Sequence, residues 1–153
     1  MQYKNIIFDD VVNYRETSMF IGTCFCDWKC CTEIGADICL CQNSPAHCLK
    51  NKEIDNEKLV RKYLKLGTMH ALVLGGFEPL WSNSWGDVLG FLRCFRSHTQ
   101  DTIVIYTGYR EEEVSDKIGQ LKELGNVIVK FGRYRPNQKP HYDDVLGVSL
   151  ANN

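Results

Sequence analysis

The sequence predicts an α/β protein whose core is a parallel β-sheet assembled from βαβ units. Short apolar segments rich in β-branched residues alternate with segments whose apolar residues recur at helical spacing, and this alternation is typical of parallel sheets. The chain has 153 residues, of which 44% are hydrophobic and 24% charged, as in an ordinary globular domain. We therefore expect one domain over residues 1–153, with its own hydrophobic core.

Five segments have the composition of strands. The first is short and leads the chain, the second runs directly into a cysteine-rich region, and the other three are separated by helical patterns. In chain order they cover residues 5–8, 18–23, 70–74, 102–106 and 126–130.

Three amphipathic helices are expected, one before each of the last three strands. The first has Asp55 or Asn56 as its N-cap and ends at Gly67. The third has Glu111, Glu112 and Glu113 in its first turn, where acidic groups favour the helix dipole, and Gly125 closes it. The apolar faces are Leu59, Val60, Tyr63 and Leu64 in the first helix, Trp85, Val88, Leu89, Leu92 and Phe95 in the second, and Val114, Ile118, Leu121 and Leu124 in the third.

Unusual residues follow four of the strands. A cysteine-rich loop over 24–48 follows one strand, and the motifs GGFEP (75–79), TGY (107–109) and FGR (131–133) follow the next three. Ligands of parallel α/β proteins bind at the carboxyl edge of the sheet, on such loops. We therefore expect these four loops to converge on one site.

Cysteine placement indicates metal chemistry. Seven of the eight cysteines lie in the loop: Cys24, Cys26, Cys30, Cys31, Cys39, Cys41 and Cys48. Clustered thiols in a reducing compartment bind metal more often than they form disulfides. We expect Cys48 and the remaining cysteine, Cys94, to be small buried hydrophobic residues.

The spacing within the loop favours an iron–sulfur cluster. Cys26 and Cys30 form a CxxxC pair, and Cys39 or Cys41 can supply a third ligand. Three cysteines on a [4Fe-4S] cube leave one iron open for a substrate or cofactor. The alternative is a structural zinc site of four cysteines, assembled from Cys24, Cys26, Cys30 or Cys31, and Cys39 or Cys41.

Charge and hydropathy argue against other classes. The net charge of −1 provides no general attraction for nucleic acid or membranes. No apolar run approaches the length of a membrane span, and the first residues lack a signal-peptide pattern. We expect a cytoplasmic protein. The basic segment 130–141 could dock an acidic partner, but a solvated loop is the simpler expectation.

These motifs, taken together and in order, resemble a known family. The run 15–24, the cysteine loop, GGFEP, and YTGY followed by Glu111 and Glu112 are similar to the anaerobic ribonucleoside-triphosphate reductase activating proteins of the radical S-adenosylmethionine superfamily. Two departures stand out. Glu33 occupies the third position of the superfamily's CxxxCxxC, so that Cys41, followed by Gln-Asn, becomes the matching third cysteine, and Phe77 is inserted into the GGEP motif.

The resemblance implies a partial, open barrel of the radical S-adenosylmethionine type. It also implies a [4Fe-4S] cluster on three cysteines and S-adenosylmethionine held by two loops, with no further catalytic side chain. The implied residues are Cys26, Cys30 and Cys41 for the cluster, and Gly75, Gly76, Phe77, Glu78, Thr107, Gly108 and Tyr109 for S-adenosylmethionine.

The implied activity is reductive cleavage of S-adenosylmethionine. The resulting radical would generate a glycyl radical on a partner enzyme, anaerobic ribonucleotide reductase, with electrons from a separate reducing donor. A radical enzyme that matures another target remains an alternative, as does a non-catalytic zinc or iron–sulfur module that recognises a partner protein.

Overall fold

The protein is an α/β structure with a mixed, mostly parallel central sheet. The computed structural model describes residues 1–135 and 137–150. The sheet has five strands in the order β2-β3-β5-β6-β7. Their bounds are β2 Asn5–Asp10, β3 Ser18–Gly22, β5 Ala71–Gly75, β6 Thr102–Thr107 and β7 Val127–Phe131. Each predicted strand therefore exists, with its ends displaced by two residues at most.

One strand runs against the predicted direction. Strands β3, β5, β6 and β7 are parallel, whereas β2 pairs antiparallel with β3. The connection from β2 to β3 covers only residues 11–17, which suits a hairpin, while a parallel pair needs a longer crossover. The expectation of an entirely parallel sheet is wrong at this edge.

The helices correspond largely to the sequence pattern. They are α1 Lys29–Thr32, α2 Asn56–Leu66, α3 Ser82–Arg96 and α4 Ser115–Leu124, with 3₁₀ turns η1 Ile38–Leu40, η2 Ser44–Cys48 and η3 Glu111–Glu113. Asp55 caps α2 by accepting a hydrogen bond from the Lys58 N–H at 2.9 Å, and Gly67 is the C-cap.

Two details of the helix predictions are wrong. The three glutamates form a separate 3₁₀ turn, because Val114 has a φ of −137° that interrupts the helix before α4 begins. Leu64 is exposed, since α2 turns Leu59, Val60 and Tyr63 toward the core instead.

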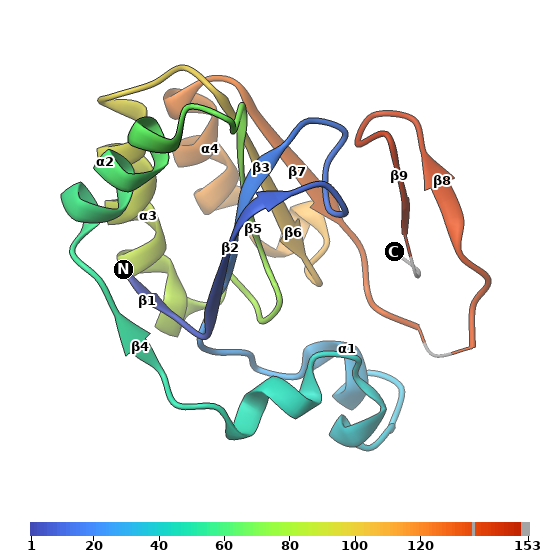
Figure 1. The fold of residues 1–153 in the computed structure, drawn as a ribbon. Helices are drawn as coiled ribbons and strands as arrows, with labels where there is room; N and C mark the ends of the chain where they lie inside the picture. Colours follow the sequence, from blue (N-terminus) through green and yellow to red (C-terminus); the bar gives the residue numbers. More distant parts are fainter. Residues whose placement is uncertain (136, 151–153) are drawn as a thin grey trace.

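Both faces of the sheet are covered. Helices α2, α3 and α4 lie on one side and form the larger core with side chains such as Leu72, Leu74 and Phe91. The other side carries a smaller core that includes Val73, Val104 and Leu146. It is covered by the hairpin of β8 His141–Asp143 and β9 Val148–Leu150, which lies apart from the helices in Figure 1. Burial on both faces explains why the central strands are apolar throughout.

Two small antiparallel pairs were not predicted. Besides β8–β9, strand β1 Gln2–Tyr3 pairs with β4 Lys52–Glu53, which ties the end of the cysteine-rich segment to the start of the chain. Figure 1 shows this segment, with α1, lying below one end of the central sheet. Among the helices of the described chain, none has the length and apolar character needed to cross a membrane.

Candidate cluster and cofactor site

The loops that follow the four parallel strands are joined by backbone hydrogen bonds. The Thr23 N–H donates to the Gly75 carbonyl at 2.9 Å, and the Glu78 N–H donates to the Phe25 carbonyl at 2.9 Å. On the other side, the Gly132 N–H donates to the Thr107 carbonyl at 3.1 Å. The expected convergence of these loops at the carboxyl edge of the sheet is therefore present.

A cavity of about 360 Å³ opens between these loops. Nine of the ten residues singled out from the sequence line it: Cys26, Cys30, Cys41, Gly75, Gly76, Phe77, Glu78, Thr107 and Gly108. Tyr109 lies just outside the lining and is buried. The cavity is thus lined by polar groups from the cysteine-rich loop and from the edge of the sheet, as expected of a ligand site.

The structure separates the two candidates for the third cysteine. Cys41 lines the cavity together with Cys26 and Cys30, whereas Cys39 is exposed and outside the lining. Cys31 also lines the cavity and is buried, although the cluster ligands expected from the spacing do not include it. Cys48, expected to be buried, is exposed, because the 3₁₀ turn η2 runs along the surface.

Cys30 lies directly against the TGY loop. A Cβ atom added to Gly108 would be 2.6 Å from the Cys30 Sγ, closer than the two atoms can approach. Glycine at this position therefore lets the sulfur approach the backbone of the loop. A second glycine has a different reason: Gly76 has a φ of +78°, and its added Cβ would be 3.3 Å from the Gly22 Cα.

The start of the cysteine loop is held in a tight turn. Trp28 has a φ of 56°, and its N–H donates to the Cys26 Sγ at 3.3 Å. Asp27 accepts a hydrogen bond from the Lys29 N–H through one oxygen, at 3.2 Å. Its other oxygen accepts from the Tyr109 hydroxyl at 2.5 Å. Tyr109 therefore connects the cysteine loop to the sheet edge.

Burial opposes ionisation of the cavity thiols. It raises the pKa of Cys26 to about 12, with the Trp28 N–H offsetting part of the effect. Burial also raises the pKa of Cys30, and the nearby Arg133 partly counteracts it. Because thiolates are the metal-binding form, a bound cation must supply the charge that displaces these protons.

The Glu78 carboxylate, which lines the cavity, accepts hydrogen bonds from both the GGFEP loop and the TGY loop. Its Oε1 accepts from the Thr107 hydroxyl at 2.7 Å and from the Leu80 N–H at 3.0 Å, and its Oε2 accepts from the Gly108 N–H at 2.7 Å. The Thr107 oxygen in turn accepts from the Tyr109 N–H at 3.1 Å. Burial raises the pKa of Glu78 to about 7, against the effect of these donors. The GGFEP and TGY loops are thus held in one arrangement by a single carboxyl group.

A buried arginine anchors the cysteine loop from the other side. Arg133 bonds Glu33 at 2.6 Å and Glu113 at 2.7 Å, and it also donates to the Gly108 carbonyl. Lys29 pairs with Glu113 at 2.6 Å. The expectation that the basic segment after β7 is a solvated loop is wrong for Arg133, whose side chain is 4% exposed because both acidic partners fold over it.

Three aromatic rings meet above the GGFEP motif. Trp28 packs edge-on against Phe77, with ring centroids 5.4 Å apart, and against His47 at 5.6 Å. The Phe77 ring also has the Lys4 ammonium 5.7 Å from its centroid. Phe77, the residue inserted into the motif, therefore seals one wall of the cavity against the cysteine loop.

The loop sulfurs are not spaced for a single metal ion. Sulfurs bound to one tetrahedral zinc lie about 3.8 Å apart. Within residues 1–135 and 137–150, one group of three Cys, His, Asp or Glu residues has ligand atoms all within 4.8 Å, and it consists of Glu57, Cys94 and His98. No three of the cavity cysteines therefore have sulfurs that all lie within that distance of one another, so this conformation holds no assembled mononuclear site among them.

Comparison with known proteins adds no relative. No protein-family model matches the chain, no curated protein matches it, and no solved structure matches it. The class of protein is therefore inferred from the residues and their arrangement alone.

Proposed function

We propose that this protein is a radical S-adenosylmethionine enzyme that generates a glycyl radical on a partner enzyme, with anaerobic ribonucleotide reductase as the first candidate. The observation that carries the proposal is the single cavity lined by Cys26, Cys30 and Cys41 together with the GGFEP and TGY loops. Under this proposal the open, mostly parallel sheet is a partial barrel of the kind that such enzymes use.

The donor set suits the proposed cluster. Three cysteine sulfurs face the cavity, and thiolates are the ligands that iron–sulfur clusters prefer. A cube bound through three of its corners places its sulfur ligands farther apart than one zinc ion does, which agrees with the absence of a mononuclear arrangement among the cavity cysteines of the described chain. When bound, the cluster and S-adenosylmethionine would supply the one-electron chemistry that breaks a carbon–sulfur bond of the sulfonium group.

The chain's own contribution is to bind, orient and shield. Gly75 and Gly76 have no side chains, so the backbone of the GGFEP loop can approach the methionine part of S-adenosylmethionine closely at the cavity wall. Glu78 holds the TGY loop in place through Thr107 and Gly108, so that both loops present one fixed surface. The aromatic contact between Trp28 and Phe77 excludes water on the cysteine side.

Anaerobic reconstitution with iron and sulfide tests the proposal. The protein should become brown, bind about four irons, and cleave S-adenosylmethionine when a chemical reductant is added. Cys26→Ala, Cys30→Ala and Cys41→Ala should each abolish cleavage. Cys39→Ala and Cys48→Ala, which change exposed cysteines of the same loop, are the matched controls and should retain it.

Three results would contradict the proposal or a part of it. Colourless protein that carries zinc after anaerobic purification would indicate a non-catalytic metal module. Cleavage retained in Cys41→Ala would remove Cys41 from the ligand set. Cleavage without an electron paramagnetic resonance signal of a glycyl radical, after mixing with anaerobic ribonucleotide reductase, would redirect the search to another target.

A further inference from the structure

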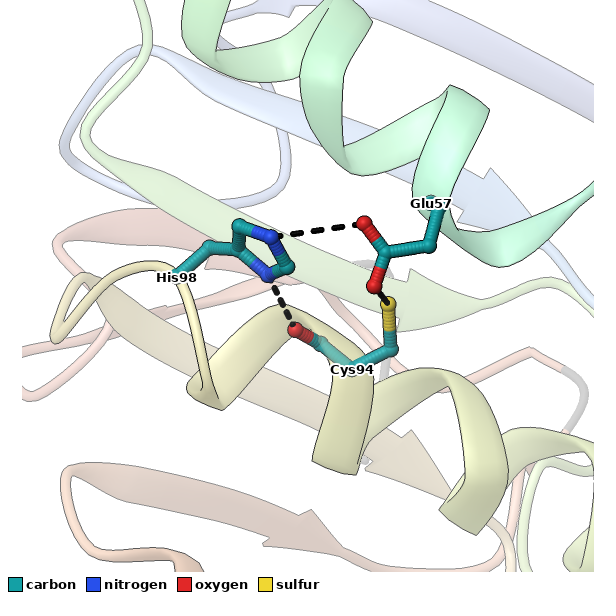
Figure 2. Close-up of side chains that lie close together, drawn as sticks. All are labelled: Glu57, Cys94 and His98. Atoms are coloured by element: carbon teal, nitrogen blue, oxygen red, sulfur yellow. Dashed lines mark hydrogen bonds and ion pairs between the residues drawn. The ribbon is translucent and has the colours of Figure 1, made fainter.

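A second cluster of metal-ligating side chains lies on the helical side of the molecule. Glu57 comes from the first turn of α2, Cys94 from the last turn of α3, and His98 from the residues just after α3. None of the three lines the cavity described above. Figure 2 shows the three side chains pointing toward one another across the gap between the two helices.

The distances within this cluster fit one metal ion. The Cys94 Sγ is 3.3 Å from the Glu57 Oε1, and the His98 Nε2 is 3.3 Å from the Glu57 Oε2. All three ligand atoms lie within 4.8 Å of one another. Ligand atoms that share a tetrahedral zinc are about 3.3–3.8 Å apart, so small side-chain rotations suffice to bring them onto one ion.

The histidine is already oriented for ligation. Its Nδ1 lies 3.0 Å from the Cys94 carbonyl oxygen and 3.0 Å from the Ser97 hydroxyl. A proton on Nδ1, donated to that carbonyl, leaves the Nε2 lone pair directed at Glu57. Histidine ligands of zinc are usually held in this way, by a hydrogen bond from the ring nitrogen that does not bind the metal.

We propose that Glu57, Cys94 and His98 bind a zinc ion that clamps α2 to α3. Sulfur, imidazole nitrogen and carboxylate oxygen are the three ligand types of zinc sites, and a thiolate with a carboxylate balances the charge of a divalent cation. A water molecule takes the fourth position, because the His98 side chain is 33% exposed and the Glu57 side chain 48% exposed. The site is separate from the proposed cluster and stabilises the helical layer.

Zinc addition to the full chain, reduced and freed of metal, tests this site. Nitrogen-detected NMR of the histidine rings should show a large change at Nε2 of His98, and His70, which is exposed elsewhere, should not respond. The wild-type protein should bind one zinc more than Cys94→Ser and His98→Gln. At free zinc about a hundred times its Kd, the wild-type Tm should rise by roughly 5–10 °C more than that of either variant.

The difference in bound zinc between the wild type and the variants measures this site alone, because zinc bound by the cysteine loop is common to all of them. His70→Gln is the control and should bind as much zinc as the wild type. Equal zinc content in the wild type, Cys94→Ser and His98→Gln would overturn the proposal. An unchanged His98 ring signal in the wild type would overturn it too, and that measurement does not depend on the folding of any variant.

Discussion

The buried Thr107 hydroxyl provides a quantitative test of how the cavity is held together. It donates to the Glu78 carboxyl group at 2.7 Å and accepts from the Tyr109 N–H at 3.1 Å, so Thr107→Val removes two hydrogen bonds with little change of shape. A hydrogen bond to a charged group contributes about 1.5–3 kcal/mol, and an unsatisfied buried N–H costs about 1–3 kcal/mol. Because the two terms share one network, they are not additive, and we expect a loss of about 3 kcal/mol when Glu78 is ionised.

The loss should depend on pH because Glu78 titrates near neutrality. Its pKa in the folded protein, about 7, lies above the ordinary value of 4.5. Between these values the native state holds more protons than the unfolded state, so the contribution of this group to stability falls as the pH rises through that window. Thr107→Val removes a donor that favours the charged form, and its cost should therefore be about 1 kcal/mol larger at about pH 8 than at about pH 5.5.

Urea unfolding of metal-free protein, followed by circular dichroism, measures both effects. Thr107→Ser is the matched control: it keeps the hydroxyl, loses one methyl group, and should cost about 1 kcal/mol at either pH. The reasoning is refuted if Thr107→Ser costs as much as Thr107→Val, or if the cost of Thr107→Val is the same on both sides of pH 7.

Three further predictions concern the anchors of the site, and each is read from urea unfolding. Arg133→Met should cost about 2–4 kcal/mol because it leaves Glu33 and Glu113 without their buried partner, and Arg133→Lys should recover only part of this, since an ammonium cannot bond both carboxylates as a guanidinium does. Burial acts to raise the pKa of Glu113, but hydrogen bonds from the Arg110 N–H, Lys29 and Arg133 hold it at about 2. The stability of the wild-type protein should therefore fall as the pH drops from 4.5 toward 2. An equally steep fall in Arg133→Met would contradict this account. Gly76→Ala should cost about 1–3 kcal/mol because of its positive φ and close packing, whereas Gly90→Ala, on the open face of α3, should stabilise by up to about 1 kcal/mol.

The strands and the convergence of their loops could be predicted because they depend on local pattern. The run from Ala71 to Gly75 is apolar at every position, and it is buried at every position. The composition of residues 5–8 predicts a strand but not its direction, which depends on the short connection 11–17 to β3. Helical spacing predicts that the glutamates before α4 belong to the helix, because spacing does not reveal the backbone break at Val114.

The spacing of the cysteines does not by itself identify the third ligand of the proposed cluster. The sequence left Cys39 and Cys41 as alternatives, and only the path of the loop through η1 turns Cys41 into the cavity and leaves Cys39 exposed. Arg133 looked like one cation of a basic loop, because its partners Glu33 and Glu113 are 100 and 20 residues away in the chain. No local signal joins residues at such separations.

By itself, then, the sequence determined the α/β class, the order of strands and helices, and the four loops that carry unusual residues, since hydrophobic periodicity and turn residues act over a few positions. The tertiary structure decided which side chains meet: Glu78 with Thr107 and Gly108, Arg133 with its two glutamates, and Glu57 with Cys94 and His98. These side-chain contacts depend on how the helices and loops pack against the sheet, and packing is a property of the whole chain that no short segment encodes.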